Sequence, residues 1–208
     1  MSLNSSKHED LKAYSLTADP LESFLSWHES ALKIEENANA MALATAAKSG
    51  VPSVRMVLFK GCLGEKFSLY GHNDSQKGLE LEENPYASLV FYWHRSLRQV
   101  RITGAVEKMT KQQTLNYFSS RALESQVASS VSKQSQPIAN RETLESNFQN
   151  ALKLAKETGS IAMPENWQGY YLVPQEIEFF IYRDFRLNDR FLFKKNSEAR
   201  WDWQRLQP

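Results

Sequence analysis

Two neighbouring segments decide the fold class of this chain: Ala87-Ser-Leu-Val-Phe-Tyr-Trp93 and Gln99-Val-Arg-Ile-Thr-Gly-Ala-Val-Glu-Lys108. Both are rich in β-branched and aromatic residues, which pack well on a pleated sheet. Only a short polar turn separates them, and strands this close in sequence pair antiparallel, because a parallel pair needs a long crossover. We therefore predict an antiparallel pair of strands over residues 87–108.

Strand-like runs continue on both sides of this pair. Towards the N-terminus, Met41–Ala47 and Val54–Lys60 flank a turn that contains Gly and Pro, and Lys66–Tyr70 follows a second glycine-bearing turn. Towards the C-terminus we predict four further strands: Gly169–Val173, Ile177–Tyr182, Arg190–Lys194 and Trp201–Arg205. Since these strands adjoin one another in sequence, we expect a mainly β or α+β barrel and not a doubly wound parallel sheet.

Helical segments precede and interrupt the strands. Asp19 and Pro20 begin the first helix, because Asp can cap it and Pro fits its first position. Further helices are predicted at Ser75–Glu83, Thr110–Arg121 and Arg141–Glu157. The stretch 122–138 is polar and rich in Ser and Gln, a composition typical of linkers. Residues 1–18 lack periodicity, so we predict a flexible N-terminal arm before a single domain over 19–208.

The composition excludes several classes of function. Lys+Arg is 25 and Asp+Glu is 24, so the net charge of +1 favours neither a nucleic-acid nor a membrane partner. Cys62 is the single cysteine, which rules out an internal disulfide and suits a reducing cytoplasm. No Cys-x-x-Cys or His-Glu-x-x-His motif predicts a metal site, and no glycine-rich phosphate loop is present. A bound phosphate would therefore be held mainly by side chains.

Two N-terminal segments could hold an anion. In Arg55-Met-Val-Leu-Phe-Lys60, alternation places the two cations on opposite faces of a straight strand, so they would serve two anions unless Lys60 lies beyond a bend. Surface cations that lay their stems over apolar neighbours are the structural alternative. In Ser75-Gln-Lys-Gly78, free helix N–H groups and Lys77 would suit an anion, although lysines are common at helix starts.

Three later segments carry further polar groups. Gln99 can donate and accept hydrogen bonds at the edge of a heteroaromatic ring, or it can simply end a solvated strand. Tyr117 and Arg121 share a helix face and, with Ser125, could donate to one phosphate, or they could form a structural stack. In Arg186-Leu-Asn-Asp-Arg190 the acid could neutralise both arginines, or the guanidinium groups could bind an anion. No nucleophile and base stand out as a pair, which indicates that a cofactor carries the chemistry.

Taken together, these segments identify a family. The chain from about Asp19 to Pro208 resembles the pyridoxine (pyridoxamine) 5′-phosphate oxidases. Ten segments carry the resemblance in order: Arg-Met-Val-Leu-Phe-Lys (55–60), Ser-Gln-Lys-Gly (75–78), Phe-Tyr-Trp (91–93), Arg-Gln-Val-Arg (98–101), Tyr-Phe-Ser-Ser-Arg (117–121), Ser-Gln (125–126), Ser-Lys-Gln-Ser (132–135), Ile-Glu-Phe (177–179), Arg-Leu-Asn-Asp-Arg (186–190) and Arg-Leu-Gln-Pro (205–208). Each is weak alone, and their order makes the match specific.

The resemblance implies an FMN-binding split β-barrel with peripheral helices and a homodimer that holds each FMN between its subunits. By position, the residues that would contact FMN are Arg55, Met56, Val57, Leu58, Phe59, Lys60, Tyr70, Gly71, Gln76, Lys77, Gln99, Gln134, Ser135, Phe180 and Arg190. The substrate phosphate would meet Lys60, Tyr117, Arg121 and Ser125, while Arg186 and Asn188, the implied catalytic pair, would lie over the substrate ring. The polar stretch 122–138 would then form part of the site wall.

Four positions depart from the family pattern. The family usually has His at Asn188, Trp at Phe180, Arg at Gln76 and Thr at Gly71. Asparagine forms hydrogen bonds but takes up no proton, and phenylalanine keeps an apolar wall without the indole donor. The changes at Gln76 and Gly71 remove one charge and one hydroxyl near the FMN phosphate, so we expect weaker FMN binding.

The activity implied by the resemblance is oxidation of pyridoxine or pyridoxamine 5′-phosphate to pyridoxal 5′-phosphate. FMN would take a hydride from C4′ of the substrate, and O2 would reoxidise the flavin with release of H2O2. With the amine substrate, water would hydrolyse the resulting imine and release ammonia. Two alternatives are a related split-barrel flavin oxidase with another substrate, as in phenazine formation, and a non-catalytic carrier of FMN or pyridoxal phosphate. Lys60 and the trio Tyr117, Arg121 and Ser125 favour a phosphorylated substrate over the first alternative. A protein that only carries FMN or pyridoxal phosphate could tolerate the replacements at Asn188 and Phe180.

Overall fold

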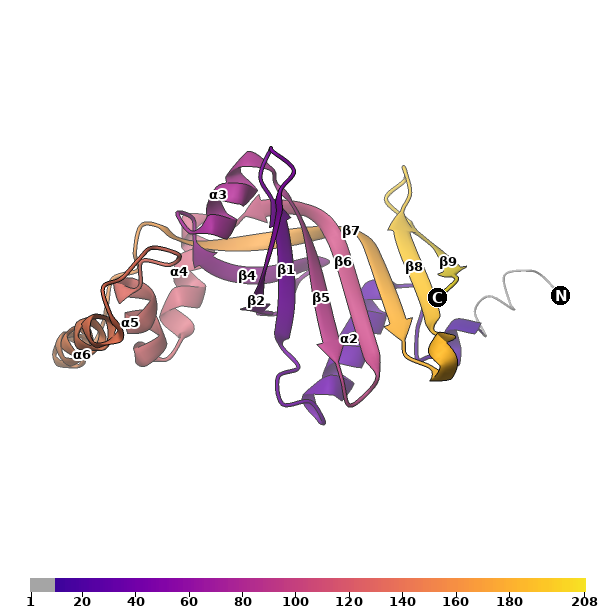
Figure 1. Ribbon diagram of the computed structural model, residues 1–208, viewed down its shortest axis with the longest axis horizontal. Coiled ribbons are helices and arrows are strands. Elements are labelled where there is room, and N and C mark those ends of the chain that lie inside the picture. Colours follow the sequence, from indigo (N-terminus) through magenta and orange to yellow (C-terminus); the bar gives the residue numbers. More distant parts are fainter. Residues whose placement is uncertain (1–9) are drawn as a thin grey trace.

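The computed structural model describes residues 10–208, which fold around one antiparallel sheet of nine strands (Figure 1). The strands are β1 (Ala40–Ala46), β2 (Pro52–Leu58), β3 (Cys62–Leu63), β4 (Lys66–His72), β5 (Tyr86–Trp93), β6 (Arg98–Lys108), β7 (Trp167–Ile181), β8 (Asp189–Lys195) and β9 (Trp201–Leu206). Their order is β2-β1-β5-β6-β7-β4-β3, and β8 joins β7 to β9. The predicted antiparallel pair is confirmed as β5 and β6, with Phe91 opposite Val100.

Strand β7 is one long element where the sequence predicts two strands. Its first half pairs with β4 and its second half with β8, while β6 pairs along nearly its whole length. Pro174 lacks an N–H group, and the β6–β7 register shifts beside it, between Thr103 and Gly104. Gly104 permits the close approach, since a Cβ there would lie 1.9 Å from the carbonyl oxygen of Val173. The strand therefore continues past the proline.

Helix α2 (Pro20–Leu32) covers the apolar face of the sheet. Asp19 caps it, as predicted, by accepting hydrogen bonds from the N–H groups of Leu21 and Glu22. Phe24 and Trp27 are almost fully buried and pack edge-on against aromatic rings of the sheet, Phe24 on Phe67 and Trp27 on Phe179. This aromatic packing fixes which face of the sheet points inward. The residues that alternate with the buried aromatic residues along each strand therefore point outward.

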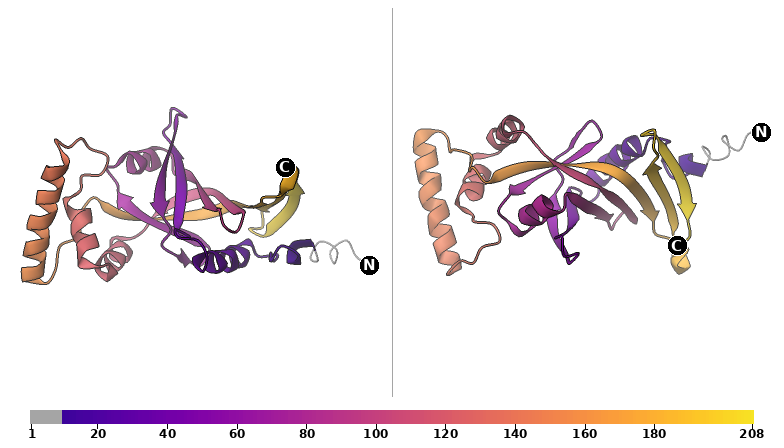
Figure 2. Two further views of the ribbon diagram at one scale, coloured as in Figure 1. Left: turned by 60° about the horizontal axis from the view of Figure 1, so that its bottom comes forward. Right: turned by 90° about the horizontal axis from the view of Figure 1, so that it is seen from above.

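Helices α4 (Lys111–Ser120), α5 (Leu123–Val131) and α6 (Arg141–Thr158) lie at one end of the molecule, and β8 and β9 lie at the other (Figures 1 and 2). The helix predicted at Thr110–Arg121 is confirmed as α4, which begins with a capping box of Thr110 and Gln113. The linker interpretation of 122–138 is wrong, because α5 forms there and buries Val127 completely. Within residues 10–208, no helix combines the length and the apolar character needed to cross a membrane.

The predicted N-terminal arm lies partly outside the described residues, which begin at position 10. From there onward the segment packs on the domain instead of standing free. Leu11 and Leu16 are each 1% exposed, and the indole N–H of Trp27 donates to the carbonyl oxygen of Tyr14 at 3.2 Å. Residues 10–18 thus extend the core beneath β8.

Candidate active site

A cavity of about 570 Å³ opens between the sheet and helices α4 and α5. We call it the main cavity. It is lined by residues from β2 and the segment after it, the end of β4, the first turn of α3 (Gln76–Glu83), the stretch from α4 to residue 134 and the first residue of β7: Met56, Val57, Leu58, Lys60, Tyr70, Gly71, His72, Lys77, Tyr117, Arg121, Ala122, Ser125, Ala128, Ser129, Ser132, Gln134 and Trp167. Eleven of the residues implicated by the resemblance therefore meet at one place.

Three cations line the main cavity, namely Lys60, Lys77 and Arg121, and no carboxylate does so in the described part of the chain. None of the three forms an ion pair with any residue between positions 10 and 208. Strand β2 ends at Leu58, so Lys60 lies beyond the alternating strand and can face the cavity. A cavity with this charge suits anions.

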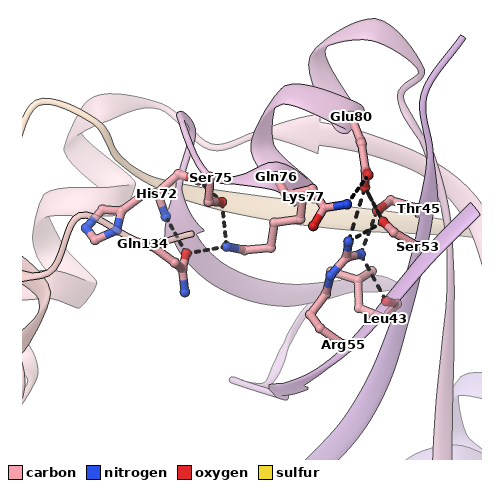
Figure 3. A network of polar contacts seen from close by, with 10 residues as sticks. All are labelled: Leu43, Thr45, Ser53, Arg55, His72, Ser75, Gln76, Lys77, Glu80 and Gln134. Carbon is pink, nitrogen blue, oxygen red and sulfur yellow. Dashed lines mark hydrogen bonds and ion pairs between the residues drawn. The ribbon is translucent and has the colours of Figure 1, made fainter. Parts of the chain in front are cut away.

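Lys77, at the start of helix α3 (Gln76–Glu83), is only 5% exposed. Its ammonium group donates to the hydroxyl of Ser75 at 2.9 Å and to the amide oxygen of Gln134 at 2.5 Å (Figure 3). Burial, followed by the nearby charge of Arg55, lowers the pKa of Lys77 to about 8. Ser75 donates to the carbonyl oxygen of His72 and does not cap the backbone N–H groups of the first turn of α3, so that turn keeps N–H groups for an anion.

Two glycines make room for side chains at the cavity. A Cβ at Gly71 would lie 2.5 Å from the ammonium nitrogen of Lys77, so the lysine occupies space that a larger residue would need. Gly169 lies opposite Tyr70 in the β4–β7 pair, and a Cβ there would lie 2.7 Å from the Tyr70 ring. These two glycines therefore leave free the space that the side chains of Lys77 and Tyr70 occupy.

An aromatic stack forms one wall. The rings of Tyr70 and Tyr117 are stacked with centroids 3.9 Å apart, and Trp167 continues the stack 5.3 Å from Tyr70. Arg121, which ends α4, places its guanidinium 5.1 Å from the Trp167 ring and donates to the hydroxyl of Ser129 at 2.8 Å. Burial lowers the pKa of this guanidinium. Tyr117, Arg121 and Ser125 thus reach the same cavity although Arg121 has left the helix.

Arg55 lies beside the main cavity and has its own acid. Its guanidinium donates to the carbonyl oxygen of Leu43 at 3.1 Å, to the hydroxyl of Thr45 at 2.6 Å and to Glu80 at 3.1 Å (Figure 3). The amide of Gln76 also donates to Glu80, at 3.0 Å. Glu80 on α3 therefore holds the side chains of both Arg55 and Gln76, and neither residue is among those that line the cavity.

A second group of implicated residues lies at the far end of the sheet. Gln99, Phe180 and Arg190 are direct neighbours across β6, β7 and β8, and we call them the distal row. They are partly exposed on the face opposite the aromatic core. Glu178 holds Arg190 by accepting from it at 2.6 Å. The loop before β8 carries Arg186, at the same end of the molecule (Figure 2).

Comparison with known proteins agrees with this geometry. A family model described as pyridoxamine 5′-phosphate oxidase matches residues 28–154, and a model of the pyridoxine 5′-phosphate oxidase C-terminal dimerisation region matches residues 167–208. The chain belongs to the pyridoxamine 5′-phosphate oxidase family. A pyridoxine/pyridoxamine 5′-phosphate oxidase from Coxiella burnetii is 40% identical over 93% of this chain and 97% of its own length. Another from Hydrogenovibrio crunogenus is 39% identical over 95% of this chain and 92% of its own.

Solved structures of related proteins share the fold. PhzG from Burkholderia lata, solved with tetrahydrophenazine-1-carboxylic acid, has a TM-score of 0.84 and 28% identity, over 92% of this chain and 93% of that one. An FMN-binding, pyridoxamine 5′-phosphate oxidase-related protein from Nostoc punctiforme has a TM-score of 0.74 at 15% identity, over 91% of this chain and 98% of that one. The predicted split barrel with peripheral helices is confirmed.

Three residues at the main cavity carry no signal in the sequence, and two further predicted FMN contacts do not line it. Trp167 and Ser129 contact Arg121, and His72 donates through Nε2 to the carbonyl oxygen of Ser129 at 2.9 Å. The strand pairing of His72 with Trp167 brings these segments together, and no local motif signals it. Phe59 is 5% exposed in the core, so it could reach a ligand only through its backbone, and Ser135 lines a neighbouring hollow.

Proposed function

We propose that this protein oxidises pyridoxine 5′-phosphate or pyridoxamine 5′-phosphate to pyridoxal 5′-phosphate, with FMN as its cofactor and O2 as electron acceptor. The family membership and the names of the relatives support this substrate class. The observation that carries the proposal is the main cavity, whose three cations lack carboxylate partners among the described residues. A flavin phosphate and a substrate phosphate together would supply the missing negative charge.

The residues of the main cavity fit FMN. Lys77 is a buried cation with only neutral hydrogen-bond acceptors, and the adjacent first turn of α3 keeps N–H groups for a phosphate. Gln134, Tyr70 and residues 56–58 would hold the rest of the cofactor. When bound, FMN supplies a two-electron acceptor for the C4′ hydride of the substrate and passes these electrons to O2, which gives H2O2.

The substrate phosphate would be held by Lys60, Tyr117, Arg121 and Ser125, which line the same cavity. Arg121 is pre-oriented by Ser129 and by the Trp167 ring, so little rotamer entropy remains to be lost on binding. The role of these groups would be to fix the distance between the substrate ring and the cofactor.

We further propose that a second copy of the chain completes each site. The distal row lies on β6, β7 and β8, and Arg186 lies in the loop before β8. Helices α4 and α5, which border the main cavity, lie at the other end of the molecule (Figures 1 and 2), so we infer that one chain does not place both groups around one ligand. A two-fold dimer would bring the distal row of one copy to the cavity of the other. The match of residues 167–208, which contain Arg186 and Arg190, to a C-terminal dimerisation region supports this arrangement.

In the completed site, Arg186 would stabilise developing charge on the substrate. Asn188 would orient the ring through hydrogen bonds and would not exchange protons. The amide oxygen of Asn188 already accepts from the backbone N–H of Arg183 at 3.0 Å, so its NH2 group is the part left for a substrate. Proton transfer at the ring would then depend on water or on the substrate itself.

Purification followed by spectroscopy tests the proposal. The protein should carry FMN absorption, and addition of pyridoxine 5′-phosphate under air should form the aldehyde product and H2O2. A protein that never takes up FMN would contradict the whole proposal. FMN binding without turnover would favour a carrier, and turnover only of a substrate that lacks phosphate would favour an oxidase of the PhzG type.

A further inference from the structure

The loop between β7 and β8 adopts a backbone that ordinary residues avoid. Phe185 and Arg186 have φ values of 55° and 62°, in the left-handed region that favours glycine. Such a conformation persists only where the surroundings hold it in place, and it is most common at functional sites. The contacts that hold this loop therefore bear directly on how Arg186 is presented.

Asp189 makes the central contacts, with a side chain that is 14% exposed. One carboxylate oxygen accepts from Nε of Arg183 at 2.9 Å, at the start of the loop. The other accepts from Nη1 of Arg205 at 2.6 Å, on the neighbouring strand β9. The loop is thus closed across its base and joined to the sheet by one acid.

The same cluster includes the N-terminal segment. Arg205 also donates through Nη2 to Asp10 at 2.7 Å. The ring of Tyr14 lies 5.6 Å from the Arg183 guanidinium and 5.5 Å from that of Arg205. Segments distant in sequence therefore meet at the base of the loop.

Arg186 itself remains uncommitted. It forms no hydrogen bond or ion pair with any residue of the described chain, and its neighbours Phe185 and Leu187 are 93% and 69% exposed. Asp189 does not neutralise Arg186 or Arg190, as the sequence alone would allow, because its partners are Arg183 and Arg205. The acid holds the loop and leaves the arginine at its tip available for an anion.

We propose that Asp189 is a positioning residue, which clamps Arg183 and Arg205 together and thereby fixes the loop conformation that presents Arg186 to the substrate. The role rests on the function proposed above. Burial raises the pKa of the Asp189 carboxyl, but hydrogen bonds from Arg183, Tyr14 and Arg205 outweigh it and hold that pKa below its usual value. The clamp is therefore charged throughout the neutral range.

A double-mutant cycle tests the coupling. Asp189→Asn keeps the shape of the side chain and removes its charge, so kcat/KM for pyridoxine 5′-phosphate should fall about tenfold to hundredfold while FMN binding is retained. The kcat/KM of the Arg186→Ala variant should fall further than that of Asp189→Asn. If Asp189 acts through Arg186, the double variant should be no worse than Arg186→Ala alone. Unchanged kcat/KM in Asp189→Asn, or losses that simply multiply in the double variant, would overturn the proposal.

Glu145→Gln is the matched control. Glu145 also accepts from an arginine Nε at 2.6 Å, but it lies on α6 at the other end of the molecule. This variant should keep wild-type kcat/KM. If Asp189→Asn does not yield FMN-binding protein, Arg183→Gln removes one arm of the same clamp, and it must show the same coupling to Arg186.

Limited proteolysis tests the loop without any turnover assay. Trypsin cleavage after Arg186, followed by mass spectrometry on the FMN-loaded protein, should be roughly tenfold faster in Asp189→Asn and unchanged in Glu145→Gln. Equal cleavage rates would overturn the clamp. If Asp189→Asn is cleaved faster than wild type but the wild-type protein oxidises no B6 phosphate, the proposed function is refuted and the clamp still holds.

Discussion

The ammonium nitrogen of Lys77 lies 2.5 Å from the amide oxygen of Gln134, although 57 positions separate the two residues. This contact joins the start of α3 to the segment after α5 across the main cavity. The contact holds a buried cation beside neutral groups. An anion that binds here would therefore stabilise the charged form of Lys77.

Removal of this charge should weaken FMN binding. Lys77→Met keeps the length of the side chain but removes the charge, so the Kd for FMN should rise by about tenfold to hundredfold, the effect of one charge-assisted hydrogen bond. Quenching of FMN fluorescence on titration with apoprotein measures it. Lys111→Met, an exposed lysine at the start of α4, is the control and should keep the wild-type Kd.

FMN affinity should also depend on pH. Since burial lowers the pKa of Lys77 to about 8, the free protein loses this proton as the pH rises through that value. Binding of a phosphate dianion favours the protonated form, so the Kd for FMN should rise by up to about tenfold per pH unit above pH 8. The Lys77→Met variant should lack this rise. Parallel pH profiles for wild type and variant would contradict the assignment.

Glu80 should matter for stability because it neutralises Arg55. The side chains are 11% and 23% exposed, so removal of the acid leaves a largely buried guanidinium unpaired. Glu80→Ala should lower the free energy of unfolding by about 3 kcal/mol, measured by urea denaturation. Glu29→Ala, which breaks the exposed pair with Lys33, should cost less than about 0.5 kcal/mol.

The same acid predicts an acid-sensitive component of stability. Burial raises the pKa of Glu80, but hydrogen bonds from Ser53, Thr45, Gln76 and Arg55 bring it below the ordinary value of 4.5. Its stabilising contribution is therefore complete above pH 4.5 and is lost as the pH falls further. The difference in stability between wild type and Glu80→Ala should shrink below that pH, and a constant difference would contradict the prediction.

Gly104→Ala should disrupt the register shift that carries β7 past Pro174. A Cβ at this position would lie 1.9 Å from the carbonyl oxygen of Val173, which cannot move without breaking the β6–β7 pairing. We expect a loss of about 3 kcal/mol or failure to fold. The neighbouring change Ala105→Gly should cost only about 1 kcal/mol in thermal or urea unfolding. Similar losses for both variants would contradict the clash.

Mixed dimers should recover activity if two copies share each site. Arg121→Ala damages the main cavity and Arg186→Ala damages the loop at the opposite end. In a mixed dimer, one site carries both defects and the other carries neither. Co-refolding of equal amounts should restore about one quarter of wild-type activity, because half of the dimers are mixed. No recovery despite mixed dimers would place both residues in one chain's site.

The ends of seven strands could be predicted to within two residues, because apolar alternation and turn residues are local signals. The two-residue strand β3 could not, and the sequence divides β7 into two strands. Helix α5 could not be predicted, since its Ser- and Gln-rich sequence resembles a linker and it is held by tertiary contacts, such as the burial of Val127 and the bond from Arg121 to Ser129. The cations of the main cavity could be identified from motifs, but their separation from the distal row could not. That separation depends on the full length of β7, which the sequence divides at Pro174.

The role of Asp189 could not be predicted either. In the sequence it lies between Arg186 and Arg190, so neutralisation of these neighbours is the local interpretation. Its actual partners, Arg183 and Arg205, come close only when β8 pairs with β9 and the loop folds back. Tertiary contacts of this kind have no periodic signature.

The length of strand β7 sets the separation between the main cavity and the distal row. Trp167 at its first residue borders the main cavity, and Phe180 near its last belongs to the distal row. An insertion of two residues would preserve the alternation of inward and outward side chains, yet it would lengthen the strand by about 7 Å. In a two-fold assembly this displacement would occur in both copies, so in neither site would the distal row of one copy reach the ligand in the main cavity of the other. Insertions should therefore be tolerated in the hairpin loops of this chain and rejected within β7.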